Sequence, residues 1–369
     1  MARVITLEEA TVHQPRAGVE LKAALGQGPS HAYLFQGPSG SGKAKAARAF
    51  AAEILTAGSD RPEETRRRAL MDPSPHPDLV WLAPKGMSHA VQEIRERVIH
   101  QAPLSPFEGS ARVFVIEAAE ALNEESQNAM LKTLEEPPPH AHLILLSAES
   151  EGVLPTIASR CQLIEFGALA PEVIEAELDG LAGPEELHAA AKLAAGDLGR
   201  ARFLAGRRGS ALREAAAGFM TAALEDDFAG SPWLELLNQA KSAGEHSGEQ
   251  VQAEFDSEKE EGIKHTKTEM EEAVRRAQRK TRTGMLDLGL HLAAAWARDW
   301  ATIIAGATNL AFNQDRLELL EAQAGRIELG QARQAISLIQ ETRRSFQLNV
   351  SEELALEALA FRLEKTLRS

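Results

Sequence analysis

The segment that decides the fold occupies positions 112–161 and has the sequence RVFVIEAAEALNEESQNAMLKTLEEPPPHAHLILLSAESEGVLPTIASRC. It begins with a short apolar run, Val113–Ile116, of the kind that is buried in parallel sheets. Glu117 and Glu120 follow this run at its carboxyl end, where open α/β sheets place their ligands. The opening of the segment therefore predicts a parallel strand that ends at a functional edge.

A helix and a second strand are expected in the rest of this segment. Asn123 is a good cap residue, and two glutamates follow it in the first turn. The helix must end at Glu136 because three prolines follow. A second apolar strand is expected over Leu143–Leu146, and the polar sequence SRC closes the segment at positions 159–161.

Working outward, three more apolar runs predict strands, at positions 32–35, 79–82 and 163–166. The chain has 369 residues, of which 44% are hydrophobic, so two or three domains are expected. No apolar run approaches the roughly 18 residues of a membrane helix, and the first residues lack a secretion signal. We therefore expect a cytoplasmic protein.

The charge and the single cysteine exclude several classes of protein. A net charge of -14 argues against a freestanding nucleic-acid binder and favours protein partners, although a local basic patch is compatible with it. Cys161 is alone, which excludes an internal disulfide framework and a zinc site built on cysteine pairs. No activating base lies nearby in sequence, so we expect a buried, unreactive thiol.

A glycine loop with the sequence GPSGSGKA begins at Gly37, after a predicted strand and before a predicted helix. This is the context of a phosphate-binding loop, in which the backbone around Gly40 and Gly42 surrounds phosphate oxygens and Lys43 adds charge. Ala44 stands where Ser or Thr would ligate Mg²⁺. The loop alone leaves nucleotide binding and a purely structural turn equally open.

A second departure from an active ATPase lies at the end of the predicted strand over 113–116. There an Asp would hold Mg²⁺ and a Glu would orient the attacking water. This chain has Glu117 and Ala118 instead. Glu117 is long enough to reach a metal, but the methyl group of Ala118 cannot act as a base. Glu120 is expected to be a solvated charge.

Three motifs resemble the clamp-loader branch of the AAA+ superfamily: HAYLFQGPSGSGK at 31–43, NAMLKTLEEPP at 128–138 and TIASRC at 156–161. The losses at Ala44 and Ala118 resemble its bacterial DNA polymerase III delta-prime family. The resemblance covers about residues 10–206. LEEPP followed by SRC is far more specific than the phosphate loop by itself.

The resemblance implies a place in a five-subunit ring with ATP between neighbours. Arg160 would be an arginine finger, given in trans to the γ-phosphate held by the next subunit. The implied partners are the ATPase subunits (gamma/tau) and the delta subunit and, through the complex, the sliding clamp and primed DNA. The resemblance further implies a non-hydrolysing stator that needs no cofactor, with weak ATP or ADP binding left open and the polymerase activity belonging to the holoenzyme. The alternative is an active AAA+ ATPase motor of the loader or of a related DNA machine, and the two alanines count against it.

Other positions of the family pattern are also altered. Ser147 and Ala148 stand where relatives sense the γ-phosphate, and Gly199 stands where a second sensing arginine is placed, with Arg200 next to it. Many relatives carry a four-cysteine zinc module, but the corresponding stretch, 56–75, has no cysteine. No metal is predicted. His76 and Asp78, which flank Pro77 just after that stretch, predict a turn held by side-chain hydrogen bonds.

The predicted fold class is α/β: a P-loop AAA+ parallel-sheet domain at 1–168, a small helical lid at 169–208 and an all-helical collar at 209–369. Within the collar, about 241–282 is charge-dense and predicts a solvated helical insertion with i,i+4 pairs. A coiled-coil docking arm is the alternative for this insertion, although its apolar seam is short. Trp296 and Trp300 are expected in the core.

Overall fold

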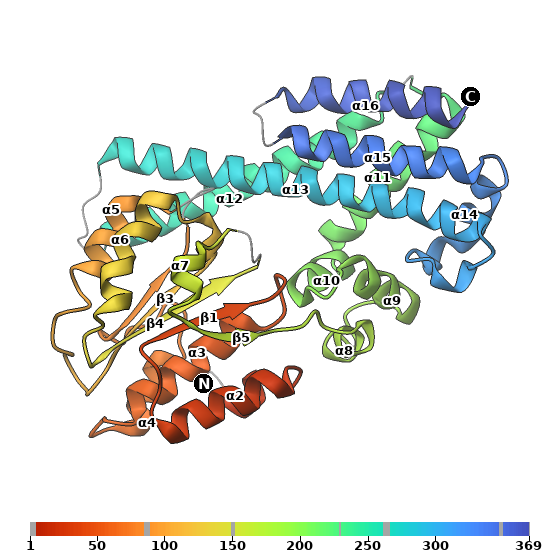
Figure 1. Cartoon of the computed structure of the whole chain (residues 1–369). Coiled ribbons are helices and arrows are strands. Elements are labelled where there is room, and N and C mark those ends of the chain that lie inside the picture. Colours follow the sequence, from red (N-terminus) through yellow and green to blue (C-terminus); the bar gives the residue numbers. More distant parts are fainter. Residues whose placement is uncertain are drawn as a thin grey trace. The chain divides into compact units, whose positions relative to one another are not determined.

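The computed structural model describes residues 5–84, 89–148, 152–228, 230–260, 266–346 and 350–368. The chain forms two compact units, Met1–Ala170 and Pro171–Ser369 (Figure 1). Among the described residues, no helix is both long and apolar enough to cross a membrane.

The first unit is built on a five-stranded sheet in the order β2-β3-β4-β1-β5, in which every pair of neighbours is parallel. The strands are β1 (Ala32–Gln36), β2 (Leu79–Leu82), β3 (Arg112–Ile116), β4 (Ala141–Ser147) and β5 (Gln162–Glu165). Each lies within two residues of a predicted strand. The sequence prediction of the strands is therefore confirmed.

Helices cover both faces of this sheet (Figure 1). One face packs against α1 (Leu7–Ala10), α2 (Pro15–Gln27), α3 (Lys43–Thr56) and α4 (Pro62–Ala69). The other packs against α5 (Val91–Ile94), η1 (Arg95–Ile99), α6 (Glu124–Glu135) and α7 (Pro155–Ala158). The side chains of β1 alternate between the two cores, with Tyr33 and Phe35 in one and Leu34 in the other, as the period of a strand requires.

The predicted helix of the opening segment is α6. The side chain of Asn123 accepts a hydrogen bond from the backbone N–H of Ser126 at 2.9 Å, so the predicted cap is confirmed. Met130 and Leu134 are buried on its inner face. The helix ends at Glu135, directly before the residue that precedes the prolines.

The second unit is helical throughout its described part, apart from its connecting turns. Its helices are α8 (Pro171–Glu177), α9 (Pro184–Leu193), α10 (Leu198–Ala205), α11 (Arg207–Glu225), α12 (Trp233–Glu260), α13 (Lys267–Ile304), α14 (Leu317–Ala324), α15 (Leu329–Ser345) and α16 (Glu352–Leu367). One apolar core runs from α9 to α16. The expected boundary between lid and collar, at 208, stays a prediction.

The two tryptophans belong to this core, as predicted. Trp296 and Trp300 are buried, and both indole N–H groups donate to Oε1 of Gln323, at 2.9 and 3.0 Å. One buried acceptor, the side-chain oxygen of Gln323, thus satisfies two indole N–H groups that would be costly to bury without a hydrogen bond.

The charge-dense stretch is helical on both sides of 261–265, which lie outside the described residues. Ion pairs with i,i+4 spacing, such as Arg276 with Glu272, are present as predicted. The structure adds that α12 and the first half of α13 form a hairpin. A Cβ at Gly244 would lie 2.8 Å from the carbonyl oxygen of Gln278, so glycine permits the close approach of the two helices.

Candidate functional site

The glycine loop lies at the carboxyl edge of the sheet, between the ends of β4 and β5. The N–H of Gly37 donates to the carbonyl of Ser147, the last residue of β4, at 3.1 Å. A Cβ on Gly37 would lie 2.0 Å from the carbonyl oxygen of Phe166, just after β5. Gly37 is therefore required by a close backbone approach, in addition to any part in binding phosphate.

Lys43 begins α3, and its ammonium group lies inside its own loop. Nζ donates to the carbonyls of Gly37 at 2.5 Å and Pro38 at 2.9 Å, and the residue is buried. Gly42, at φ +94°, allows the sharp entry into the helix. Ala44, the next residue of α3, is exposed and presents only a methyl group. The loop has the backbone shape of a phosphate site, while its cation is bonded to loop carbonyls.

Gln14 joins this loop to the segment after β5, a contact that no pattern in the sequence indicates. Its Nε2 donates to the carbonyls of Ser41, at 3.0 Å, and Gly167, at 2.8 Å. Its Oε1 accepts from the N–H of Gly167 at 3.0 Å. A single glutamine before a proline is indistinguishable from a surface residue in sequence, because both of its partners are distant along the chain.

Glu117 is directed to β2. Its carboxylate accepts a hydrogen bond from Nε1 of Trp81 at 2.6 Å, and its carbonyl lies 2.6 Å from Nε2 of His89. Ala118 then adopts a left-handed conformation, with φ +48°. The carboxylate that the sequence offered as a metal ligand is thus used in a contact between neighbouring strands.

The expectation that Glu120 is a solvated charge is wrong. Its carboxylate accepts hydrogen bonds from the hydroxyl of Ser147 at 2.8 Å and from the N–H of Ala148 at 3.2 Å. The short turn η2 (Ala119–Ala121) after β3 brings Glu120 beside the end of β4, which is the neighbouring strand. The residues expected at the altered γ-phosphate sensor are therefore bonded to a carboxylate of their own chain.

Arg160 follows α7 and lies at the surface, with 36% of its side chain exposed. Nη2 forms an ion pair with Oε1 of Glu135, the last residue of α6, at 2.7 Å. Nη1 donates to the carbonyl of Thr156 at 2.9 Å. The Glu135 side chain is 52% exposed, and a pair of this kind contributes about 0–1 kcal/mol, so the guanidinium can exchange its partner at small cost.

A buried glutamine fixes the backbone that leads into α7. Nε2 of Gln127 donates to the carbonyls of Leu122 at 2.9 Å and Gly152 at 3.0 Å. Oε1 accepts from the N–H of Leu154, which precedes α7, at 2.7 Å. The helix α6, at whose end LEEPP begins, thereby positions α7, the helix that SRC directly follows.

Cys161 is partly buried and packs against the apolar core on the α6 and α7 side of the sheet. Burial raises the pKa of this thiol to about 12. The predicted unreactive thiol is thus supported by its surroundings.

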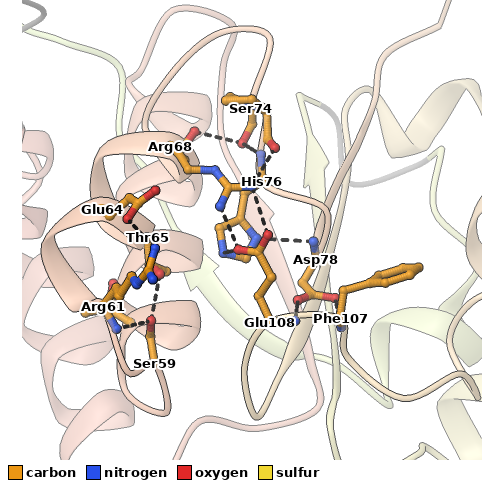
Figure 2. Close-up of polar contacts among 12 residues, drawn as sticks. Ser59, Arg61, Glu64, Thr65, Arg68, Ser74, His76, Asp78, Phe107 and Glu108 are labelled. Carbon is orange, nitrogen blue, oxygen red and sulfur yellow. Dashed lines mark hydrogen bonds and ion pairs between the residues drawn. The ribbon is translucent and has the colours of Figure 1, made fainter.

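A polar network joins residues of the stretch 56–75 to His76, Asp78 and Glu108 (Figure 2). Arg68 forms two hydrogen bonds with the carboxylate of Glu108, at 2.6 and 3.2 Å. The carboxylate of Asp78 accepts from the N–H groups of Phe107 and Glu108, at 2.8 and 2.9 Å. Nδ1 of His76 accepts from the N–H of Asp78 at 3.2 Å, which confirms the predicted hydrogen-bonded turn.

The electrostatics of this network disfavour a cation. Burial and the charge of Arg68 lower the pKa of His76, so the imidazole is neutral at pH 7. The Glu108 carboxylate is already neutralised by an arginine, and the arginine lowers its pKa. Within the part of the chain that the structure describes, no three His, Cys, Asp or Glu side chains form a group that could hold a metal ion.

Arg200, beside the expected second sensor at Gly199, lines a hollow of about 370 Å³ inside the second unit. Asp287, His291 and Arg343 line the same hollow. Arg343 forms two hydrogen bonds with Asp287, both 2.8 Å long. The interpretation of this position as a lost sensor stays a prediction.

Comparison with known proteins bears on the first unit. Residues 14–170 match the family model described as DNA polymerase III, delta subunit. The DNA polymerase III subunit delta' of Bacillus subtilis (strain 168) is 32% identical over 151 residues, which cover 40% of this chain and 46% of that protein. The first unit is therefore similar in sequence to delta' subunits of DNA polymerase III. The tau subunit of the same organism is 31% identical over 160 residues, covering 43% of this chain and 28% of tau.

The matches span less than half of either relative's own length. A solved structure that aligns with 96% of this chain and all of its own is a DNA polymerase III gamma subunit-related protein from Thermotoga maritima, with a TM-score of 0.45 and 15% identity. The predicted α/β class, a parallel-sheet domain followed by a helical region, is confirmed by the strand order and the order of the elements.

Proposed function

We propose that the chain is a delta-prime-type clamp-loader subunit of DNA polymerase III, which does not hydrolyse ATP itself and gives Arg160 to ATP held by a neighbouring subunit. The observation that carries the proposal is an asymmetry in the first unit. Lys43 donates a hydrogen bond inside its own loop, and the carboxylate of Glu117 accepts one from Trp81. Arg160, in contrast, lies at the surface in an exposed ion pair with Glu135.

The chemistry of phosphoryl transfer explains why this asymmetry matters. Hydrolysis needs a hydroxyl or carboxylate on Mg²⁺ and a group that orients water, and Ala44 and Ala118 supply neither. Charge builds up on the oxygens of the transferred phosphoryl group, and a guanidinium that reaches them accelerates the reaction by about 10³–10⁵. A subunit that has the guanidinium but lacks the Mg²⁺ ligand and the water-orienting group assists hydrolysis in its neighbour.

The partners follow from this division of labour. The neighbour must be an ATPase, for which the gamma/tau subunits are the proposed candidates, and the delta subunit completes the ring. The sliding clamp and primed DNA are engaged through the complex, in the cytoplasm, during DNA replication. The chain needs no bound cofactor for this role, and neither zinc nor catalytic Mg²⁺ has a set of ligands among the residues discussed above.

The second candidate is an active motor subunit, favoured by the 31% identity to tau. It would need Glu117 to leave Trp81 and bind Mg²⁺, and a further group to orient water. The two candidates differ in where the catalytic turnover occurs, so kinetic measurements separate them.

The test is a clamp loader reconstituted with wild-type chain or with Arg160→Ala, assayed for DNA-stimulated ATP hydrolysis in single-turnover experiments. Turnover at the interface that Arg160 serves is expected to fall about 10³-fold. Arg67→Ala is the matched control, since Arg67 is an exposed arginine of the same unit. Equal rates for wild type and Arg160→Ala, in loaders that assemble equally, contradict the proposal.

A further inference from the structure

The base of the α12–α13 hairpin forms the wall of a surface hollow of about 670 Å³, which the proposed function does not use. The other wall is the start of α16 with the end of α15. Four basic side chains line the hollow: Lys241 from α12 and Arg275, Arg279 and Arg282 from α13. The hollow lies entirely within the second unit.

The basic charge is concentrated on one stretch of α13. From 273 to 286 there are five basic residues and no acidic residue, in a chain with a net charge of -14. Arg275, Arg279 and Arg282 have i, i+4, i+7 spacing, so they share a helix face and span roughly 10 Å along its axis. A line of cations on that scale is long enough to lie along several phosphates of one strand, which follow one another about every 3.4 Å of helix axis in DNA.

The acidic residues of the hollow lie across from this line or at its rim. Glu352, in the first turn of α16, is ion-paired to Arg282. Glu245 and Glu353 are exposed. On the α13 side, the side chains of Arg275 and Arg279 are exposed. Glutamates on the opposite wall disfavour a second anionic strand, so the hollow suits one strand better than a duplex.

An aromatic ring shares the hollow with these cations. Phe346 and Val350 form its apolar part. Grooves that bind single strands combine cations along the backbone with aromatic rings on which bases stack. An acidic peptide would be attracted by the cations but would gain nothing specific from the ring.

We propose that this hollow binds single-stranded nucleic acid, with Arg275 and Arg279 contacting phosphates and Phe346 stacking on a base. The inference rests on the second unit alone and is independent of the proposed function, which rests on the first. A loader assay of Arg160 can fail while this surface still binds, and the reverse also holds.

The test measures fluorescence anisotropy of a labelled oligodeoxythymidylate of about 20 nucleotides with the full chain, between about 50 and 200 mM salt. Arg275→Gln/Arg279→Gln removes two phosphate contacts, which lowers the slope of log affinity against log salt by about 1.4. Raising the salt fourfold then costs the wild type about 7-fold more affinity than it costs the variant.

Two controls separate this site from general charge. Arg207→Gln/Arg208→Gln removes the same charge from exposed positions at the start of α11 and is expected to leave the slope unchanged. Phe346→Leu keeps an apolar side chain but removes the ring, so affinity is expected to fall about 10-fold at an unchanged slope. Thermal unfolding of each variant confirms that it is folded.

Three results would overturn the inference. The first is no binding by the wild-type chain at the lowest salt, and the second is an equal loss of binding in the two double variants. The third is displacement of the labelled oligonucleotide from the wild-type chain by polyglutamate as effectively as by unlabelled oligonucleotide. The last result assigns the surface to an acidic peptide.

Discussion

The glycine-loop edge and the SRC segment belong to the same sheet domain, yet their polar groups are treated in opposite ways. At the edge, Lys43, Glu117 and Glu120 all bond to groups of the chain itself. Around SRC, Arg160 lies at the surface, where it contacts the exposed carboxylate of Glu135 and the carbonyl of Thr156. Under the proposed function, this difference separates a site that has lost its own chemistry from a group that is kept for a partner subunit.

The largest expected effect in a test of this comparison concerns Cys161, which directly follows the exposed Arg160. Its pKa is raised from 9.0 to about 12 by burial, so the thiolate fraction below pH 9 is about 10³-fold smaller than in an exposed thiol. Alkylation by iodoacetamide between pH 7 and 9 should be slower by that factor and should rise tenfold per pH unit. A rate like that of a free thiol would show that the segment opens and that Arg160 is not on a fixed support.

Arg160→Lys tests whether charge alone suffices at the surface. Lysine keeps the charge but lacks the planar fork of donors that matches a phosphate, so the assisted turnover should fall about 10²-fold. Single-turnover hydrolysis in the reconstituted loader measures it. Full activity with lysine would mean that the position supplies only electrostatic attraction.

Gly37→Ala tests the glycine-loop edge of the sheet. Its φ of +154° and a Cβ 2.0 Å from the carbonyl oxygen of Phe166 require the backbone to shift, which should destabilise the first unit by about 1–3 kcal/mol. Gly26→Ala is the control, because a Cβ there meets nothing within 4 Å and the residue lies inside α2. Equal melting temperatures for the two variants would contradict the close approach.

Glu135→Gln gives the smallest effect. The exposed ion pair with Arg160 is worth about 0–1 kcal/mol, so the free energy of unfolding should change by less than 1 kcal/mol. Denaturant unfolding of the purified chain measures it. A loss of several kcal/mol would mean that Arg160 is a structural residue, fixed in its place.

The features that could be predicted from the sequence are those that depend on residues close together along the chain. The strands follow from apolar runs, and the cap of α6 follows from Asn123 and the acidic turn after it. The contacts of Glu120 with Ser147 and of Arg160 with Glu135 join residues 25–27 positions apart. They depend on which strands are adjacent and on where two helices end, and neither is encoded in a local pattern.

The central claim is that this chain assists hydrolysis without carrying it out. The most direct test is Mg²⁺-dependent ATP turnover by the purified chain, with and without primed DNA, beside a Lys43→Ala preparation. The account predicts that the two preparations give the same rate. Turnover by the wild type that exceeds that of Lys43→Ala would contradict the account and make the chain a motor subunit.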